Sequence, residues 1–164
     1  MKTEVSDINK ISTIKVDDWK SAYIDIIEND YLNRMSLNEQ IDKYNNSYSL
    51  KDVFVAELNN EIVGFCRVYD YNNPEFEDTE IDCEIKEIYV RPDMKRMVIG
   101  SKLFNFVLNY FKTNGKKKLY LGVFADNYKS RRFYEKMGGT LWKSGYLEIN
   151  NIEYPTVSYI YKLN

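Results

Sequence analysis

The chain has 164 residues, of which 44% are hydrophobic and 29% are charged, and its net charge at pH 7 is −2. This composition is that of an ordinary globular protein, and the length predicts one domain spanning residues 1–164. The sequence contains no histidine, which excludes Ser/His and Cys/His nucleophilic systems and every metal site that needs an imidazole. Any proton transfer therefore falls to Tyr, Glu, Asp, Lys or water.

The N-terminal stretch MKTEVSDINK mixes acids and bases without an apolar run, so no secretory signal is expected. No apolar run approaches the length of a membrane span, and we expect a cytoplasmic protein without a membrane partner. Cys66 and Cys83 each lie inside a strand-like run, and we expect both to be buried as small hydrophobes. A catalytic thiolate needs a cationic neighbour or a helix N-terminus, and neither is evident.

The first half of the chain predicts two helices and a hairpin. Residues 17–29 have an acidic start and helical apolar spacing. Ser36 and Glu39 form a capping-box pattern that begins a second helix. Residues 53–70 then read as two strands around Asn59-Asn60, a tight turn that asparagine tolerates.

The second half alternates strands and helices. We expect strands at 83–90, 117–127, 140–149 and 155–161, and helices at 98–115 and 128–139. One face of the first of these helices is predicted to carry Ile99, Leu103, Phe106, Val107 and Tyr110. The strand–helix–strand unit implies locally parallel strands, and the hairpins add antiparallel pairs. The predicted fold class is therefore α/β (α+β), a mixed, mostly antiparallel sheet with helices on both faces.

Charge is segregated along the sequence. Residues 91–136 hold 12 Lys/Arg and 3 Asp/Glu, a charge of +9, which indicates an anionic ligand. The competing interpretation is a set of solvated cations at helix ends. No nucleic-acid partner is expected, because the sequence pI is about 5.4 and no aromatic-basic strand motif is present.

The stretch KRMVIGSKLF, residues 95–104, follows the strand-like KEIYVRP and leads into a helix. Such a helix N-terminus offers unpaired amides and a positive dipole end to an anion. The stretch resembles the acyl-CoA loop of the GNAT superfamily of N-acetyltransferases, Gln/Arg-x-x-Gly-x-Gly/Ala. In that register Lys95 keeps only the charge, Val98 replaces the first glycine, and Gly100 is retained. IYVRP before the loop, and Asn127 with FYEKMGG after it, match the same family in order and spacing.

The resemblance implies acetyl-CoA as cosubstrate, without a metal, and a role for each matching position. The backbones of Ile88, Tyr89 and Val90 would pair with the pantetheine arm, and Asn127 would bind its end, unless Asn127 is only a helix cap. Ser130 and Arg131 would lie beside the cofactor, and Tyr134 would protonate the leaving thiolate. The amides expected to hold the pyrophosphate are those of Lys95, Arg96, Met97, Val98, Ile99, Gly100 and Ser101.

The sequence allows alternatives for the general base and for the acceptor. Glu84 or Glu87 would accept the amine's proton directly or through a water, and a salt bridge is the alternative fate of either carboxylate. Gly122 stands where relatives that acetylate protein N-termini carry Glu. Residues 74–87 predict a small cationic primary amine as acceptor, because one base, Lys86, stands there against seven acids: Glu75, Glu77, Asp78, Glu80, Asp82, Glu84 and Glu87. The alternatives are a protein or peptide amine, a non-catalytic CoA-binding module and a nucleic-acid-binding module; a homodimer is left open.

Overall fold

The computed structural model describes residues 4–71, 80–95 and 98–163. The helices are α1 (Ile8–Ala22), α2 (Asn29–Arg34), α3 (Leu37–Asn46), α4 (Ile99–Thr113) and α5 (Tyr128–Lys136). The strands are β1 (Val53–Leu58), β2 (Glu61–Asp70), β3 (Cys83–Val90), β4 (Lys118–Phe124), β5 (Thr140–Ile149) and β6 (Ile152–Lys162). Short 3-10 turns lie at Val5–Asp7, Leu50–Asp52 and Pro92–Met94.

The six strands form one mixed sheet in the order β1-β2-β3-β4-β6-β5. The β1–β2, β4–β6 and β5–β6 pairs are antiparallel, whereas β3 and β4 run parallel. The predicted α/β class with a mostly antiparallel sheet is therefore confirmed. The chain divides into two compact units: the N-terminal unit contains residues 1–68 and 87–107, and the C-terminal unit contains residues 69–86 and 108–164. The assignment of the whole chain to one domain stays a prediction.

The N-terminal unit is organised around an apolar cluster formed by residues of α1, α3, β1 and β2. Ile8, Ile11 and Ile14 of α1 recur every three residues, so they lie on one helix face, and all three are buried. Their partners come from α3 and the β1–β2 hairpin, namely Tyr44, Val53, Val55, Ile62 and Phe65. Burial of these side chains holds the helices against the hairpin.

The helix predicted at residues 17–29 is placed wrongly along the chain. Helix α1 begins nine residues earlier, at Ile8, and ends at Ala22. The adjacent acids Asp17 and Asp18 resemble a helix start, but Asp18 is buried inside the helix, where its carboxylate pairs with Lys95. The stronger signal was the isoleucine spacing that precedes them.

Two Asn-Asn turns close the hairpins. Asn59 and Asn60 have φ angles of 51° and 64°, and Asn150 and Asn151 have the same two values. Positive φ at both central residues is the hairpin geometry that asparagine tolerates. The predicted Asn59-Asn60 turn is confirmed, and the second turn makes β6 begin at Ile152 rather than at the predicted residue 155.

Other local expectations are confirmed in part. The Ser36 hydroxyl accepts from the Glu39 amide at 3.4 Å, which caps α3 as predicted. Both cysteines are buried, and burial raises the pKa of each thiol. The α4 residues predicted to share one face are not all buried, since Phe106 and Tyr110 are exposed, and the buried side chains are Leu103, Phe104, Val107 and Phe111.

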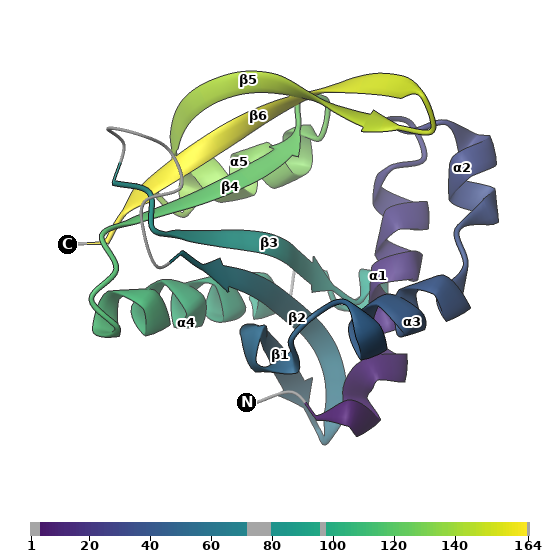
Figure 1. The fold of residues 1–164 in the computed structure, drawn as a ribbon, viewed down its shortest axis with the longest axis horizontal. Coiled ribbons are helices and arrows are strands. Elements are labelled where there is room, and N and C mark those ends of the chain that lie inside the picture. The colour runs from purple at the N-terminus through teal and green to yellow at the C-terminus, as the bar shows by residue number, and fades with distance from the viewer. Residues whose placement is uncertain (1–3, 72–79, 96–97, 164) are drawn as a thin grey trace. The chain divides into compact units, whose positions relative to one another are not determined.

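The C-terminal unit holds the parallel start of β3 beside β4, followed by β6 and β5. Figure 1 shows β5 and β6 as a long hairpin next to β4. Leu119, Leu121 and Tyr159 are fully buried or nearly so. Strand β5 is different, because Leu141, Tyr146 and Leu147 remain 54%, 72% and 46% exposed.

Candidate active site

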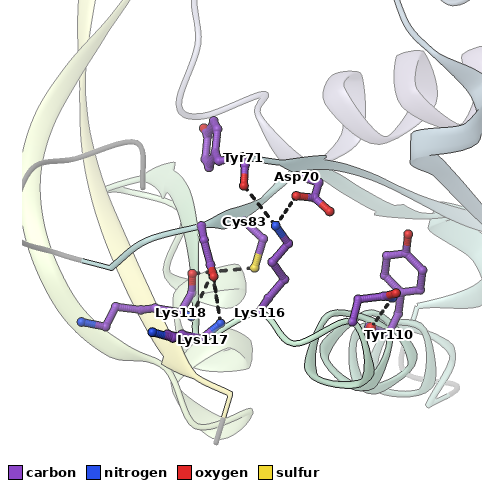
Figure 2. Close-up of polar contacts among 9 residues, drawn as sticks. Asp70, Tyr71, Cys83, Tyr110, Lys116, Lys117 and Lys118 are labelled. Atoms are coloured by element: carbon purple, nitrogen blue, oxygen red, sulfur yellow. Dashed lines mark hydrogen bonds and ion pairs between the residues drawn. The ribbon is translucent and has the colours of Figure 1, made fainter. Parts of the chain in front are cut away.

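Polar contacts of the Asp82 carboxylate and the Lys116 ammonium fix where β3 and β4 begin, and we call these contacts the polar clamp. The Asp82 carboxylate accepts hydrogen bonds from the backbone amides of Lys117 and Lys118 at 3.1 Å. Figure 2 shows Lys116 reaching back to the end of β2, where its ammonium donates to the Tyr71 carbonyl at 3.0 Å and pairs with Asp70. These contacts set the parallel register that places Glu84 opposite Tyr120.

Glu84 is a buried carboxylate with three polar or aromatic neighbours in the C-terminal unit. The Tyr71 hydroxyl donates to Glu84 Oε2, and the Lys86 ammonium lies 3.0 Å from the same oxygen. Burial raises the pKa of Tyr120, and the negative charge of Glu84 raises it further. Tyr120 therefore stays a neutral phenol beside an ionisable carboxylate.

Two further aromatic side chains, Tyr69 and Trp142, lie next to the aromatic neighbours of Glu84. The rings of Tyr69 and Tyr71 lie 4.9 Å apart, and those of Tyr120 and Trp142 lie 6.0 Å apart. We call Tyr69, Tyr71, Glu84, Tyr120 and Trp142 the aromatic surface. Lys86 Nζ lies 5.7 Å from the Tyr69 ring centroid, a distance at which a cation is attracted to the ring face. The arrangement suits ammonium groups.

Glu87, the second carboxylate predicted on β3, belongs to a buried ion cluster in the N-terminal unit. Its carboxylate pairs with Lys15, accepts from Arg67 Nε at 2.9 Å, and accepts from the Tyr44 hydroxyl at 2.7 Å. Burial opposes ionisation of Glu87, but Lys15 and Arg67 outweigh it and hold the pKa of Glu87 below its ordinary value. A carboxylate bound this fully is a weak proton acceptor, so its geometry favours the salt-bridge alternative.

The segment Ile88–Val90 follows directly along β3. The parallel pairs with β4 involve Cys83, Glu84 and Ile85, so Ile88–Val90 lies beyond them in the strand. Tyr89 is anchored by Trp19 of α1, whose indole N–H donates to the Tyr89 hydroxyl at 2.8 Å. A Cβ on Gly64 would lie only 3.0 Å from the Tyr89 carbonyl, so this glycine permits the close approach of β2 and β3.

The predicted phosphate loop is described at Lys95 and from Val98 onward, and Arg96 and Met97 lie outside the described residues. The Lys95 ammonium pairs with Asp18 of α1. Burial raises the pKa of Asp18, and the charge of Lys95 opposes that rise. Much of the Lys95 charge is therefore balanced within the protein, and the described residues of the loop offer an anion chiefly backbone amides.

Val98 directly precedes α4 and has a backbone conformation normally used by glycine. Its φ is +38°, and its carbonyl accepts the first helical bond, from the Lys102 amide at 3.0 Å. Ile99, Gly100 and Ser101 then occupy the first turn, where amides have no intrahelical acceptor. Valine thus adopts a left-handed backbone at the position where the resembled motif has glycine, and the amides of Ile99, Gly100 and Ser101 remain available as donors.

Asn127 caps α5, and its expected contact with the pantetheine arm stays a prediction. Its Oδ1 accepts from the Ser130 amide at 3.3 Å. Arg131 ties the same helix to the sheet, since its guanidinium donates to the Ala125 carbonyl at 2.9 Å and to the Tyr159 hydroxyl at 3.2 Å. Both contacts are structural, and they fix the direction in which α5 leaves β4.

Tyr134 is a buried side chain on α5. The Tyr161 hydroxyl donates to the Tyr134 carbonyl at 2.6 Å, which fixes the backbone from which the phenol projects. A Cβ on Gly139 would lie 2.6 Å from that hydroxyl, so a glycine is needed where α5 meets β6. The sequence FYEKMGG therefore supplies both the phenol and the glycine that lets its helix dock.

The predicted site residues fall into both units. The N-terminal unit contains Glu87, Ile88–Val90 and the described loop residues, and the C-terminal unit contains Glu84, Asn127, Ser130, Arg131 and Tyr134. Of the seven acids predicted to attract a cationic acceptor, Glu75, Glu77 and Asp78 lie outside the described residues.

Sequence reasoning missed the partners of the two glutamates. Lys15 and Arg67 stand inside apolar runs, which signals a buried charge that needs a counterion. Aligning β3 and β4 at their starts would have paired Glu84 with Leu119, and the observed register is one residue further along, with Glu84 opposite Tyr120.

Within residues 4–71, 80–95 and 98–163, no three or more Cys, Asp or Glu side chains gather as a metal-binding group. In the same described ranges, no helix combines the length and apolar character of a membrane span.

The sequence profile of the acetyltransferase (GNAT) family matches residues 14–139. The chain therefore belongs to this family, and it is an acetyl-CoA-dependent acyltransferase.

A Bacillus subtilis protein named as an N-acetyltransferase, YuaI, is 29% identical over 77% of this chain and 71% of its own length. Among solved structures, the acetyltransferase yncA of Salmonella typhimurium, solved with acetyl-CoA, has a TM-score of 0.72 at 18% identity, covering 100% of this chain and 92% of that one. The PaiA N-acetyltransferase of Thermoplasma acidophilum, in complex with coenzyme A, has a TM-score of 0.68 at 19% identity and coverage of 98% and 97%. These two likenesses show the fold.

Proposed function

We propose that this enzyme transfers the acetyl group of acetyl-CoA to a small cationic primary amine by direct attack. The observation that carries the proposal is Glu84, a buried carboxylate among tyrosines that already holds an ammonium, that of Lys86, at 3.0 Å. Such a carboxylate both attracts a cationic amine and accepts its proton.

The acetyl donor fits the backbone groups of the N-terminal unit. Acetyl-CoA supplies a thioester and a pyrophosphate anion. The first-turn amides of Ile99, Gly100 and Ser101 suit the pyrophosphate, because they point out of a helix N-terminus with its positive dipole end. The Ile88–Val90 backbone of β3 offers the pantetheine amides a strand edge, as the family resemblance implies.

Proton transfer is assigned to two side chains of the C-terminal unit. The acceptor ammonium gives a proton to Glu84, directly or through a water, which frees the nitrogen lone pair. The nitrogen then bonds to the acetyl carbon while the carbon–sulfur bond breaks, and Tyr134 gives its proton to the departing sulfur. The nitrogen loses its second proton to the Tyr134 phenolate through water, which leaves the neutral amide and restores the phenol. Glu87 is not assigned as the general base, since two cations and a phenol already bind its carboxylate.

The test is a thiol-release assay with acetyl-CoA against small cationic amines, neutral amines and peptides with free N-termini. We expect turnover with small cationic amines, and we expect Glu84→Gln to lower kcat/KM for the best of them by about 10²–10⁴-fold. Glu153→Gln, which removes an exposed carboxylate from β6, is the matched control and should stay near wild type. A preference for peptides, or full activity in Glu84→Gln, would contradict the proposal.

A further inference from the structure

Lys86 sits where a cationic acceptor needs to bind. Its ammonium lies 3.0 Å from Glu84 Oε2 and 5.7 Å from the centroid of the Tyr69 ring. The Tyr71 hydroxyl donates to the same carboxylate oxygen. A carboxylate, a phenol and a ring face together make an ammonium site, and the protein fills that site with its own side chain.

The two partners differ in how freely they can move. The Glu84 side chain is 11% exposed and the Lys86 side chain is 36% exposed. Lysine carries its charge on a flexible four-carbon stem and is strongly hydrated, so it can leave for water at little cost. Glu84 has no such route, because its strand register and Tyr71 hold it in place. The ammonium is therefore the exchangeable member of the pair.

We propose that Lys86 is a built-in competitor of the acceptor: its ammonium occupies the Glu84 site in the free enzyme, and a cationic amine must displace it. This inference rests on the proposed function for the identity of the incoming amine. Two ammonium groups at contact distance from one carboxylate repel each other, so binding of the acceptor expels Lys86 into solvent. Displacement leaves the carboxylate facing the acceptor's nitrogen alone.

Competition of this kind selects among acceptors. A neutral amine gains little from displacing Lys86, since it offers no charge to replace the lost ion pair. A compact primary ammonium replaces both the ion pair and the contact with the Tyr69 ring. Lys86 therefore acts as a specificity residue, because an amine binds only if its own interaction with Glu84 is strong enough to displace the Lys86 ammonium.

Lys143 provides a matched control outside the Glu84 ion pair. Its Nζ lies 4.3 Å from the centroid of the Trp142 ring, and within the described part of the chain no carboxylate pairs with it. Removing Lys143 changes the charge of the C-terminal unit by the same amount as removing Lys86. The two variants separate direct competition from a general change of electrostatic potential.

The binding test uses n-butylammonium chloride as the probe, at constant ionic strength, with protein carrying ¹³C at its glutamate carboxyl carbons. The Glu84 signal is assigned by its loss in Glu84→Gln. We expect Lys86→Met to bind the probe about two- to fivefold more tightly than wild type, the range of a partly exposed ion pair. Lys86→Arg, which keeps the cation, and Lys143→Met should both bind like wild type.

Binding in this assay does not require turnover, so it separates the inference from the proposed function. Equal affinity in Lys86→Met and wild type, or equal gains in Lys86→Met and Lys143→Met, would overturn the competition. Where the thiol-release assay finds an acceptor, its KM should fall by the same factor in Lys86→Met. In a calorimetric titration with the same probe, which needs no Glu84 signal, the gain should vanish in the Glu84→Gln/Lys86→Met double variant relative to Glu84→Gln, because the contested carboxylate is gone.

Discussion

Two glutamates three residues apart on β3 are both buried and differ in their partners. Glu87, in the N-terminal unit, is bound by two cations and the Tyr44 hydroxyl. Glu84, in the C-terminal unit, is bound by one phenol and one ammonium that is partly exposed to solvent. The difference teaches that burial alone does not define a catalytic carboxylate. What matters is whether its partners can be exchanged.

If the C-terminal unit performs the chemistry, the largest effect should come from Tyr134. Tyr134→Phe keeps the ring and removes the proton, so we expect kcat to fall by about 10²–10⁴-fold with little change in melting temperature. The measurement is steady-state kinetics at a pH where chemistry is rate-limiting. Tyr128→Phe, on the exposed first turn of α5, is the control and should remain active. Normal turnover in Tyr134→Phe would reduce Tyr134 to a packing residue.

If Glu87 stabilises the N-terminal unit, Glu87→Gln should mainly lower the free energy of unfolding. Removing this charge leaves Lys15 and Arg67 buried without a counterion, which costs about 3–5 kcal/mol of unfolding free energy. Urea denaturation measures the loss. Glu84→Gln should cost only about 1 kcal/mol, since its partner Lys86 reaches solvent. Where Glu87→Gln fails to fold, Tyr44→Phe removes a single hydrogen bond and should cost about 1 kcal/mol.

The contribution of Glu87 to the free energy of unfolding should depend on pH. The folded-state pKa of Glu87 lies below its ordinary value of 4.5, so its stabilising contribution is complete above that pH and is lost as the pH falls through the folded pKa. We therefore expect the stabilities of wild type and Tyr44→Phe to decline in parallel with acid, while Glu87→Gln lacks this part of the decline. A Glu87→Gln curve parallel to wild type below pH 4.5 would contradict the ion cluster.

A smaller effect is expected at the clamp that positions Glu84. Asp82→Ala removes the acceptor for the amides of Lys117 and Lys118, and we expect a loss of about 1–2 kcal/mol, as for a helix cap. Asp42→Ala, on the exposed side of α3, should be nearly neutral. Equal stabilities for the two variants would show that the β3–β4 register does not depend on the clamp.

The parts of the molecule that depend on local sequence were predictable. Asn59-Asn60 marks its turn through backbone preference alone, and Ser36 marks its helix through one cap. The second Asn-Asn turn carried the same signal and was missed because Pro155 was taken as the start of the final strand. The predicted start of the first helix failed because a buried Asp18 resembles an exposed helix start.

The chemistry of the site was less accessible from the sequence. Glu84 and Glu87 are equivalent candidates when only their strand is known. Their roles separate through partners far along the chain, since Lys15 lies 72 residues from Glu87. No local pattern records such contacts, because they exist only once the strands and helices have packed.

Valine at position 98 affects whether the first turn of α4 loses its conformational entropy on folding or on ligand binding. A β-branched residue at φ +38° is strained by about 1–3 kcal/mol and persists only where its surroundings determine it. Glycine at this position would visit many conformations and would have to be ordered when a ligand arrives. With valine, the ordering cost falls on folding, so the first turn of α4 is preorganised, and the pyrophosphate that we propose to bind there would meet amides that are already aligned.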